Sequence, residues 1–414
     1  ITYIMYESMT RTSSESLYRY TASDSYTFNS STGTFSLDNP SVLQYSTSYS
    51  NLINKYVVDC SGSSSTTADT STNLTSIYKI LDAKYTSGAS TPGRLSYVQY
   101  NKSINEYDYS DDGIYASEDD LGTSYYFRGN ITNNYVKFAG YYWRIIRING
   151  DGSLRVIYDG TSAHTNSDAS TDRQIGTSAY NTNYNDNAYV GYMYGTAGST
   201  TYEATHTNTN NSTIKTYIDN WYNTNIKNTP NASYVVDAIY CNDRTRVTDT
   251  TKMAELDGYW SFTSTGEGFG TKATYYGIFN RTLGDFTTVT PSLKCPETRD
   301  KFTVSNTHGN GKLDNPIGLI TVDEMVFGGS MANWNNNTVN NETYLYNGDY
   351  YYWTMSPFPF NGDRANVGRG DRGAVGGSYV DDAGYGVRPV ISLLSSGITD
   401  GNGTASAPFI IGSE

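Results

Sequence analysis

The sequence predicts a β-dominated α+β protein, and three observations support this class. Charged residues make up only 17% of the 414 residues, whereas Gly (39) and Tyr (41) are abundant. Tyr and Thr suit half-exposed strands, and a polar, weakly charged composition suits long helices poorly. Four short apolar runs between residues 124 and 158 alternate with turn signals, and one segment carries a strong helical pattern. We therefore expect a small N-terminal β module followed by a larger β-rich domain with one or two helices.

Residues 1–20 have a pattern of their own. Ile1, Ile4, Met5 and Met9 fall at helical spacing. This spacing predicts an N-terminal helix or tether, although an edge strand fits the same residues equally well.

Residues 21–105 form the predicted β module. Alternating runs at 25–28 and 33–37 are separated by four polar residues, a length typical of a β-hairpin. Residues 61–72 are almost entirely Ser, Thr, Gly and Asp, which indicates a loop.

Residues 106–122 are predicted to be an acidic linker between domains. Six acidic residues lie between Asp108 and Asp120, among Tyr, Ser and Gly. A calcium loop is the alternative, since calcium prefers oxygen ligands, but the spacing around the turn glycine does not match a calcium-binding loop. We expect no cofactor, and calcium is the remaining candidate, at Asp111, Asp112, Gly113, Glu118, Asp119 and Asp120.

Residues 123–414 make up the predicted main domain, and its first part is the strongest β signal. Apolar runs at 125–128, 135–138, 142–148 and 154–158 are separated by Asn133-Asn134, by Ala139-Gly140 and by an Asn-Gly-Asp-Gly run at 149–152. Such pairs accept positive φ and close tight hairpins. The pattern predicts an antiparallel meander.

Two segments are predicted to be helical. In residues 212–226, apolar side chains including Ile214 and Ile218 recur on one helical face. In residues 316–328, Thr321 can cap a short helix whose first turn is acidic.

Composition and charge limit the function classes. The net charge of −13 would repel a phosphate backbone, so nucleic acid is excluded as a partner. No stretch approaches the roughly 18 apolar residues that span a bilayer. A composition rich in Tyr, Ser, Thr, Asn and Gly is typical of extracellular proteins, which predicts a location outside the cell, at the cell surface.

The chain has three cysteines, Cys60, Cys241 and Cys295, so at least one lacks a partner within the chain. In an oxidising compartment we expect Cys241 and Cys295 to form a disulfide. Three buried, unreactive thiols are the alternative.

Eight phrases between residues 124 and 412 resemble a family of surface proteins from Gram-positive and related gut bacteria. They are YFRGN (126–130), YWRII (142–146), DNWYN (219–223), CNDR (241–244), LKCP (293–296), GLITVDE (318–324), YWTMSP (352–357) and GVRPV (386–390). That family is similar to the formylglycine-generating-enzyme-like branch of the C-type-lectin-like fold. The resemblance implies a C-type-lectin-like main domain in an extracellular protein, in some relatives attached to a pilin-like N-terminus.

A polar, Gly-rich segment at 358–383 is the predicted binding surface. It has no regular pattern and lies between two apolar runs, and irregular polar segments on a rigid frame commonly carry function. Aromatic, amide, carboxylate and guanidinium groups suit a carbohydrate or another surface ligand. The alternative is that Arg–Asp pairs only hold a long loop in place. The predicted ligand-binding residues are Phe358, Phe360, Asn361, Asp363, Arg364, Asn366, Arg369, Asp371, Arg372, Tyr379 and Asp381.

Catalysis is not expected. His164, His206 and His308 lie in polar stretches without metal-ligand spacing and are predicted to be solvated. Arg388 lies inside an apolar run and is predicted to form a buried pair, because an unpaired buried charge is costly. We therefore expect a non-catalytic surface protein for adhesion or recognition of a host or environmental ligand. The alternative is a subunit that self-associates into a pilus-like filament.

Overall fold

The computed structural model describes residues 112–251, 265–282, 290–330 and 343–412, together with the backbone of short strands before residue 108. The chain divides into two compact units, Ile1–Ala68 and Asp69–Glu414. In the first unit, β1 (Tyr26–Asn29) pairs antiparallel with β2 (Thr34–Leu37), as predicted. Residues 1–20, on which the expectations of a tether and of filament assembly rest, lie outside the described residues, as does Cys60.

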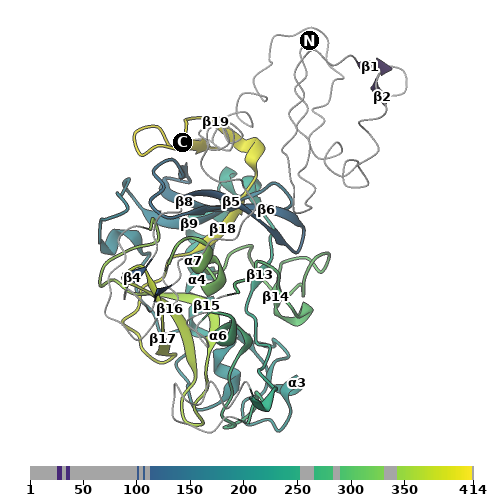
Figure 1. Ribbon diagram of the computed structural model, residues 1–414, viewed down its shortest axis with the longest axis vertical. Coiled ribbons are helices and arrows are strands. Elements are labelled where there is room, and N and C mark those ends of the chain that lie inside the picture. Colours follow the sequence, from purple (N-terminus) through teal and green to yellow (C-terminus); the bar gives the residue numbers. More distant parts are fainter. Residues whose placement is uncertain are drawn as a thin grey trace. The chain divides into compact units, whose positions relative to one another are not determined.

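A nine-stranded sheet is the largest element of the second unit. Its order is β12-β18-β9-β8-β7-β20-β19, with β6 joined to β8 and β5 joined to β6. Strands β8, β9 and β18 are labelled together in Figure 1. The members are β5 (Gly113–Asp119), β6 (Gly122–Arg128), β7 (Tyr135–Phe138), β8 (Tyr141–Ile148), β9 (Leu154–Gly160), β12 (Val235–Val236), β18 (Val390–Leu393), β19 (Ile398–Asp400) and β20 (Phe409–Ile411).

The four strands predicted as a meander all form, but their pairing is not sequential throughout. Strand β8 pairs with β9 along one edge, and both β7 and β6 pair with its other edge. The β7–β8 turn places Ala139 and Gly140 at φ 54° and 80°, the pair of positive φ values that favours a tight hairpin.

The predicted acidic linker 106–122 is wrong for most of its length. Residues 113–119 form β5, which pairs with β6 along seven residues. Two of these acidic residues, Asp119 and Asp120, form ion pairs with distant cations, which the local sequence does not show. The carboxylate of Asp119 lies 2.6 Å from Nη1 of Arg147, and that of Asp120 lies 2.8 Å from Nζ of Lys301.

A second, three-stranded sheet consists of β15 (Tyr352–Phe358), β16 (Asn366–Asp371) and β17 (Ala374–Tyr379). The segment predicted to be irregular is therefore largely a β-hairpin. Its turn places Arg372 and Gly373 at φ 49° and 79°.

Glycines hid this hairpin from the sequence pattern. A Cβ at Gly368 would lie 3.0 Å from the ring of Phe358, and one at Gly377 would lie 2.4 Å from it. A Cβ at Gly370 would lie 2.4 Å from the ring of Tyr352. At these three positions the hairpin has no room for a side chain, so the apolar alternation that would mark the strands is interrupted there.

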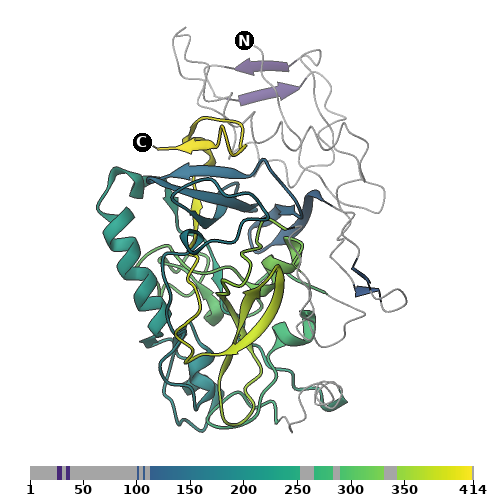
Figure 2. The same cartoon turned by 90° about the vertical axis from the view of Figure 1, so that its left-hand side faces the viewer.

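Both predicted helices are confirmed. α4 (Thr213–Tyr222) is capped by Ser212 and continues as a π-helical turn, η4 (Asn223–Lys227); its teal ribbon runs along one side of the unit in Figure 2. α7 (Val322–Phe327) begins with a capping box of Thr321 and Glu324. It lies between the large sheet and the β15–β17 sheet (Figure 1), and contacts both. Among the described residues, no helix has the length and apolar character needed to cross a bilayer.

The remaining helices and strands of the described residues are short. They are β3 (Tyr100–Asn101), β4 (Glu106–Tyr107), β10 (Met193–Tyr194), β11 (Asn210–Asn211), β13 (Tyr240–Cys241), β14 (Lys301–Phe302), α3 (Tyr202–Thr205), α6 (Gly277–Thr282), η2 (Thr171–Arg173), η3 (Asn187–Val190), η5 (Pro230–Tyr234), η6 (Thr298–Asp300) and η7 (Ser395–Gly397).

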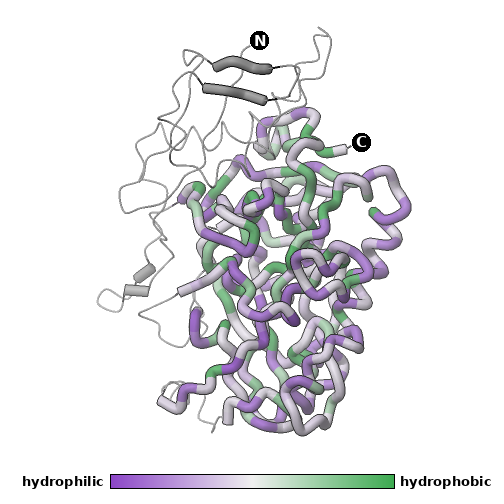
Figure 3. Tube along the Cα trace, turned by 90° about the vertical axis from the view of Figure 1, so that its right-hand side faces the viewer, coloured by the Kyte–Doolittle hydropathy of each residue, from purple (hydrophilic) through white to green (hydrophobic). Residues whose placement is uncertain are grey.

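The core fills the space between the sheets and helices. Trp143 and Trp353 are fully buried within it. Figure 3 shows hydrophobic residues recurring inside the described body and hydrophilic ones mostly along its outer loops. The backbone N–H of Trp353 donates to the carbonyl of Gly386 over 3.1 Å, which places the Val-Arg-Pro-Val run at 387–390 beside the Trp353 strand. Arg388 is fully buried and paired with Asp159, as predicted.

Candidate binding face

Three of the predicted ligand-binding residues do not reach the surface. Phe358 and Phe360 are fully buried, and Asn366 is 3% exposed. The ring of Phe358 packs against Phe279, with centroids 5.8 Å apart. The Nδ2 of Asn366 donates to the carbonyl of Pro359 over 2.9 Å. These side chains support the hairpin from within the core, because β15 is buried along its whole length and the first residues of β16 are buried as well.

Arg369 and Asp371 lie on the outer face of the hairpin. Their side chains form an ion pair of 2.8 Å. The guanidinium lies 4.8 Å from the ring centroid of Tyr351 and 5.2 Å from that of Tyr385, and it also contacts the hydroxyl of Ser378. Burial and the nearby carboxylate of Asp371 raise the pKa of Tyr351 above its usual value. The cluster is half-buried, and most of its polar groups are used within it.

Arg372 lies at the tip of the hairpin. It pairs with Asp349, whose side chain is mostly exposed, and its guanidinium carbon lies 5.9 Å from the ring of Tyr351. This ion pair attaches the tip of the hairpin to Asp349, a residue outside the 358–383 segment. It is an Arg–Asp contact with a structural role, the alternative to ligand binding.

Arg364 lies between two tyrosine rings. Its guanidinium carbon is 4.8 Å from the ring centroid of Tyr184 and 4.9 Å from that of Tyr379. Asp381 lies 3.8 Å away, and one of its oxygens, Oδ1, is buried without a hydrogen-bond partner among the described residues. Asn361 fixes the loop, because its Oδ1 accepts from the N–H of Arg364 over 2.7 Å. We call Tyr184, Arg364 and Tyr379 the Arg364 stack.

Asp363 is exposed, and its backbone N–H donates to the same Asn361 oxygen over 3.0 Å. Its position is therefore set by the turn.

Eight of the predicted residues thus line the outer side of the hairpin or its loops, but they form two separate groups around Arg364 and Arg369.

A polar hollow adjoins the Arg364 stack. Its volume is about 480 Å³. The N–H of Asn181 donates to the carbonyl of Val380 over 2.9 Å, and the carbonyl of Tyr184 accepts from the N–H of Ala365 over 2.7 Å. These bonds hold residues 181–184 against the hairpin. The hollow is lined by Asn181, Thr182, Asn183, Tyr194, Asn211, Ser212, Thr213, Thr216, Tyr217 and Asn220.

The lining is uncharged, yet it is rich in hydrogen-bonding groups. Asn181 is 2% exposed, and its Nδ2 has no hydrogen-bond partner among the described residues. Asn183 and Asn220 are exposed, and Tyr194 and Tyr217 are half-buried. The sequence reasoning missed this group because its members come from three separate segments. The run of alternating Asn residues at 181–187 was the only available signal.

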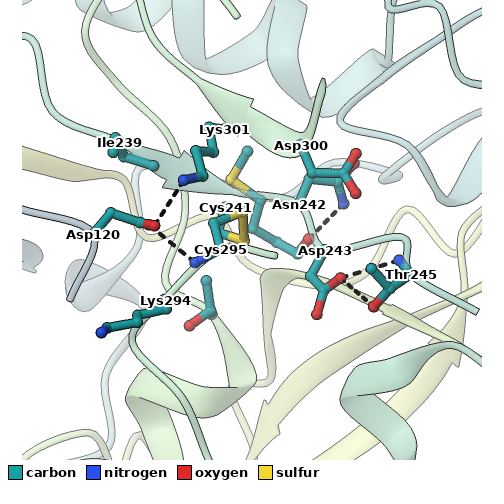
Figure 4. The surroundings of a disulfide bond; sticks show 12 residues. Asp120, Ile239, Cys241, Asn242, Asp243, Thr245, Lys294, Cys295, Asp300 and Lys301 are labelled. Atoms are coloured by element: carbon teal, nitrogen blue, oxygen red, sulfur yellow. Dashed lines mark hydrogen bonds and ion pairs between the residues drawn. A yellow bond between two sulfur atoms is a disulfide. The ribbon is translucent and has the colours of Figure 1, made fainter. Parts of the chain in front are cut away.

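The predicted disulfide between Cys241 and Cys295 is present (Figure 4). Asp120 accepts from the backbone N–H of Cys295 and from Nζ of Lys301, over 2.9 and 2.8 Å. A small space of about 40 Å³ lies beside the bridge, enough for little more than water.

No group of three or more potential metal-ligating side chains occurs among the described residues. The carboxylates of Asp119 and Asp120 form ion pairs with Arg147 and Lys301.

Two of the three histidines, His206 and His164, are not solvated as predicted. His206 is 1% exposed, and its Nε2 lies 2.9 Å from the carbonyl oxygen of Gly268. His164 is partly buried beside Asp172, at 3.0 Å, whereas His308 is exposed as predicted. The residues around His206 come from distant segments, so its burial has no local sequence signal.

Comparisons with known proteins do not place this chain in a family. No protein-family model matches the chain, and neither a characterised protein nor a solved structure resembles it closely enough to count as a match.

Proposed function

We propose that this chain is a non-catalytic recognition protein that binds a neutral carbohydrate in the polar hollow beside the Arg364 stack. The observation that carries the proposal is the uncharged lining of a hollow of about 480 Å³ in a chain whose net charge is −13. Ligand sites typically span about 300–1,000 Å³.

The chemistry of the lining suits sugar hydroxyls. An Asn amide both donates and accepts hydrogen bonds, as a hydroxyl does, and Thr and Ser add further hydroxyls. Tyr rings offer apolar faces with a polar tip. Asn181 supports the same reading, because a buried amide nitrogen without a partner gains most from a hydrogen-bond acceptor supplied by a ligand.

The Arg364 stack would form the rim of the site. The Arg364 side chain is 38% exposed, and the two rings hold its guanidinium in place, so binding a ligand would cost this side chain little conformational freedom. A location outside the cell, with a role in adhesion, accords with the Cys241–Cys295 bridge, because disulfides persist in oxidising compartments.

A glycan array with the purified chain tests the proposal. The double substitution Asn183→Ala/Asn220→Ala removes two exposed amides from the hollow, and we expect affinity for the selected glycan to fall about tenfold or more, at about 1 kcal/mol for each hydrogen bond. Asn185→Ala is the matched control, since Asn185 is exposed in the same segment but does not line the hollow.

Two results would oppose the proposal. The first is unchanged affinity of the double variant. The second is loss of binding only on Arg369→Ala, which would move the site to the other side of the hairpin.

A further inference from the structure

Asn361 and Gly362 lie in the loop between β15 and β16 and do not line the polar hollow. They form one of five Asn-Gly pairs in the sequence. A glycine after asparagine leaves the next backbone nitrogen open to the Asn carboxamide, because glycine has no Cβ to shield it. The surroundings of each pair therefore decide whether the two groups react.

The carboxamide of Asn361 is polarised by two backbone donors. Its Oδ1 accepts from the N–H of Asp363 over 3.0 Å and from that of Arg364 over 2.7 Å. Two N–H groups on one carbonyl oxygen stabilise the oxyanion that forms when a nucleophile adds to the carbon. The leaving group is unrestrained, since Nδ2 of Asn361 makes no hydrogen bond to the described residues.

The nucleophile is equally unrestrained. Across the described residues, the N–H of Gly362 has no hydrogen-bond partner. The residue has a φ of 93°, and a Cβ built on it would meet the carbonyl oxygen of Thr271 at 3.7 Å, an ordinary contact. Chain connectivity places this nitrogen and Cγ of Asn361 in one five-membered ring, so no distant group has to approach.

We propose that Asn361 is a self-modification site, at which the backbone nitrogen of Gly362 attacks Cγ of Asn361. The N–H proton passes to water or hydroxide, the N–Cγ bond forms and the Cγ–Nδ2 bond breaks, and Nδ2 leaves as ammonia. Water then opens the cyclic imide at either carbonyl and gives aspartate or isoaspartate. Ring closure releases one ammonia and ring opening consumes one water, so no electrons are transferred.

The modification changes the loop that carries the Arg364 stack. Either product adds one negative charge beside Asp363, and isoaspartate also adds a methylene to the backbone. Phe360 is fixed by two backbone hydrogen bonds to Thr274, of 2.8 and 2.9 Å. The extra length therefore has to be taken up on the Arg364 side of the turn.

The Asn-Gly pair at 149–150 has the same sequence but opposite restraints. Asn149 is 6% exposed, and its Nδ2 donates to the hydroxyl of Ser153 over 2.8 Å. The N–H of Gly150 donates to Oδ2 of Asp119 over 2.8 Å. A hydrogen bond that has to break on the nucleophile slows the attack by up to roughly tenfold.

The pair at 310–311 is restrained in the same way. Nδ2 of Asn310 donates to the carbonyl of Arg299 over 2.8 Å, so the leaving group is held. The N–H of Gly311 donates to Oγ1 of Thr303 over 3.2 Å, so the nucleophile is held as well.

Asn347 and Asn402 complete the comparison. Asn347 is 2% exposed, which keeps water away from its carboxamide. Asn402 is exposed, and its Oδ1 accepts two hydrogen bonds, both from Thr404. However, a Cβ at Gly403 would lie 2.4 Å from the carbonyl oxygen of Asn133, so this backbone is tightly packed. Asn402 is therefore the main competitor of Asn361.

Timed peptide mapping of the full chain tests the proposal. The folded protein is incubated near neutral pH, and each sample is digested briefly in acid, which suppresses the reaction during handling. We expect conversion at Asn361 to exceed that at each of the other four pairs by roughly tenfold. Both aspartate and isoaspartate should form, and the rate should rise with pH, because the attacking nitrogen has to lose its proton. In urea the five pairs should react at similar rates, since the folded contacts are gone.

An intact Asn361, or faster conversion at Asn402, would overturn the proposal and show that the two hydrogen bonds lock the carboxamide away from Gly362. Formation of aspartate alone would also overturn it, because direct hydrolysis bypasses the ring. Asn361→Gln should abolish the acidic variant that ion-exchange chromatography separates, since Gln closes a larger ring less readily. Asn310→Gln is the matched control and should leave that variant in place, with circular dichroism confirming the fold of both.

Discussion

Arg388 and Asp159 form an ion pair away from solvent, with 2.8 Å between Nη2 and Oδ1 and both side chains fully buried. The same oxygen lies 2.7 Å from Nε of Arg173, and the other oxygen lies 3.9 Å from Nη1 of Arg144. One carboxylate therefore serves three buried guanidiniums. Their remaining donors go largely to backbone carbonyls, including those of Ile131, Tyr344 and Tyr158.

Asp159→Asn should destabilise the fold strongly. Removing one partner of a buried ion pair costs about 3–5 kcal/mol, because an uncompensated charge remains. Urea unfolding followed by Trp fluorescence measures the change. Asp382→Asn is the control, since Asp382 is exposed and its effect should stay within about 0.5 kcal/mol. Equal stability of the two variants would contradict the role given to Asp159.

Gly377→Ala should destabilise the chain, whereas Gly376→Ala should not. A Cβ at Gly377 would lie 2.4 Å from the ring of buried Phe358, and overpacking of this kind costs about 1–3 kcal/mol. At Gly376 the nearest atoms are 3.4 Å away, an ordinary contact. Thermal unfolding of the two variants checks the difference, and a reversed order would show that the hairpin faces the other way.

Loss of the Cys241–Cys295 disulfide should lower the free energy of unfolding. The bridge spans 54 residues, and the chain-entropy model gives about 4 kcal/mol for a loop of that size. Cys241→Ser/Cys295→Ser removes the bridge without leaving a free thiol at either position. Chemical unfolding of the oxidised wild type and the double variant should separate them, and superimposable curves would argue against a contribution from the bridge.

His206 should make stability depend on pH near neutrality. Burial and the nearby charge of Arg244 hold its pKa well below its usual value of 6.5. The unfolded chain therefore takes up a proton as pH falls through 6.5 while the folded chain does not, so stability is lost with falling pH.

The slope attributable to His206 is about 1.4 kcal/mol per pH unit below pH 6.5. His206→Gln keeps a donor for the carbonyl of Gly268 but does not titrate. Urea unfolding between pH 7.5 and 5.5 should show a flatter dependence for this variant than for wild type. Parallel dependences would assign the pH effect to other groups.

Local patterns predicted much of the fold. The strands between residues 125 and 158, the helix from Thr213 and the capping box at Thr321 follow from alternation, helical spacing and cap residues. Strand β5 and the β16–β17 hairpin were missed for opposite reasons. At the end of β5, the distant cation of Arg147 pairs with Asp119, and in the hairpin, aromatic rings occupy the space beside glycines.

The binding face was harder to predict than the fold. Alternation does not mark Phe358 and Asn366 as buried, because their neighbours in β15 and β16 are buried on both faces. The polar hollow had no such signal, because Asn181, Tyr194 and Asn220 become neighbours only through tertiary packing. Long-range pairs such as Asp159 with Arg388 likewise depend on contacts that one sequence does not reveal.

The sheet order has a consequence for synthesis on the ribosome. Strands β18 (Val390–Leu393) and β20 (Phe409–Ile411) pair with β9 (Leu154–Gly160) and β7 (Tyr135–Phe138), which are made much earlier. A nascent chain must therefore carry two uncovered strand edges until β18 and β20 have been made, and open edges invite pairing with other chains. Delayed closure of this kind makes the chain dependent on protection from aggregation during its own production.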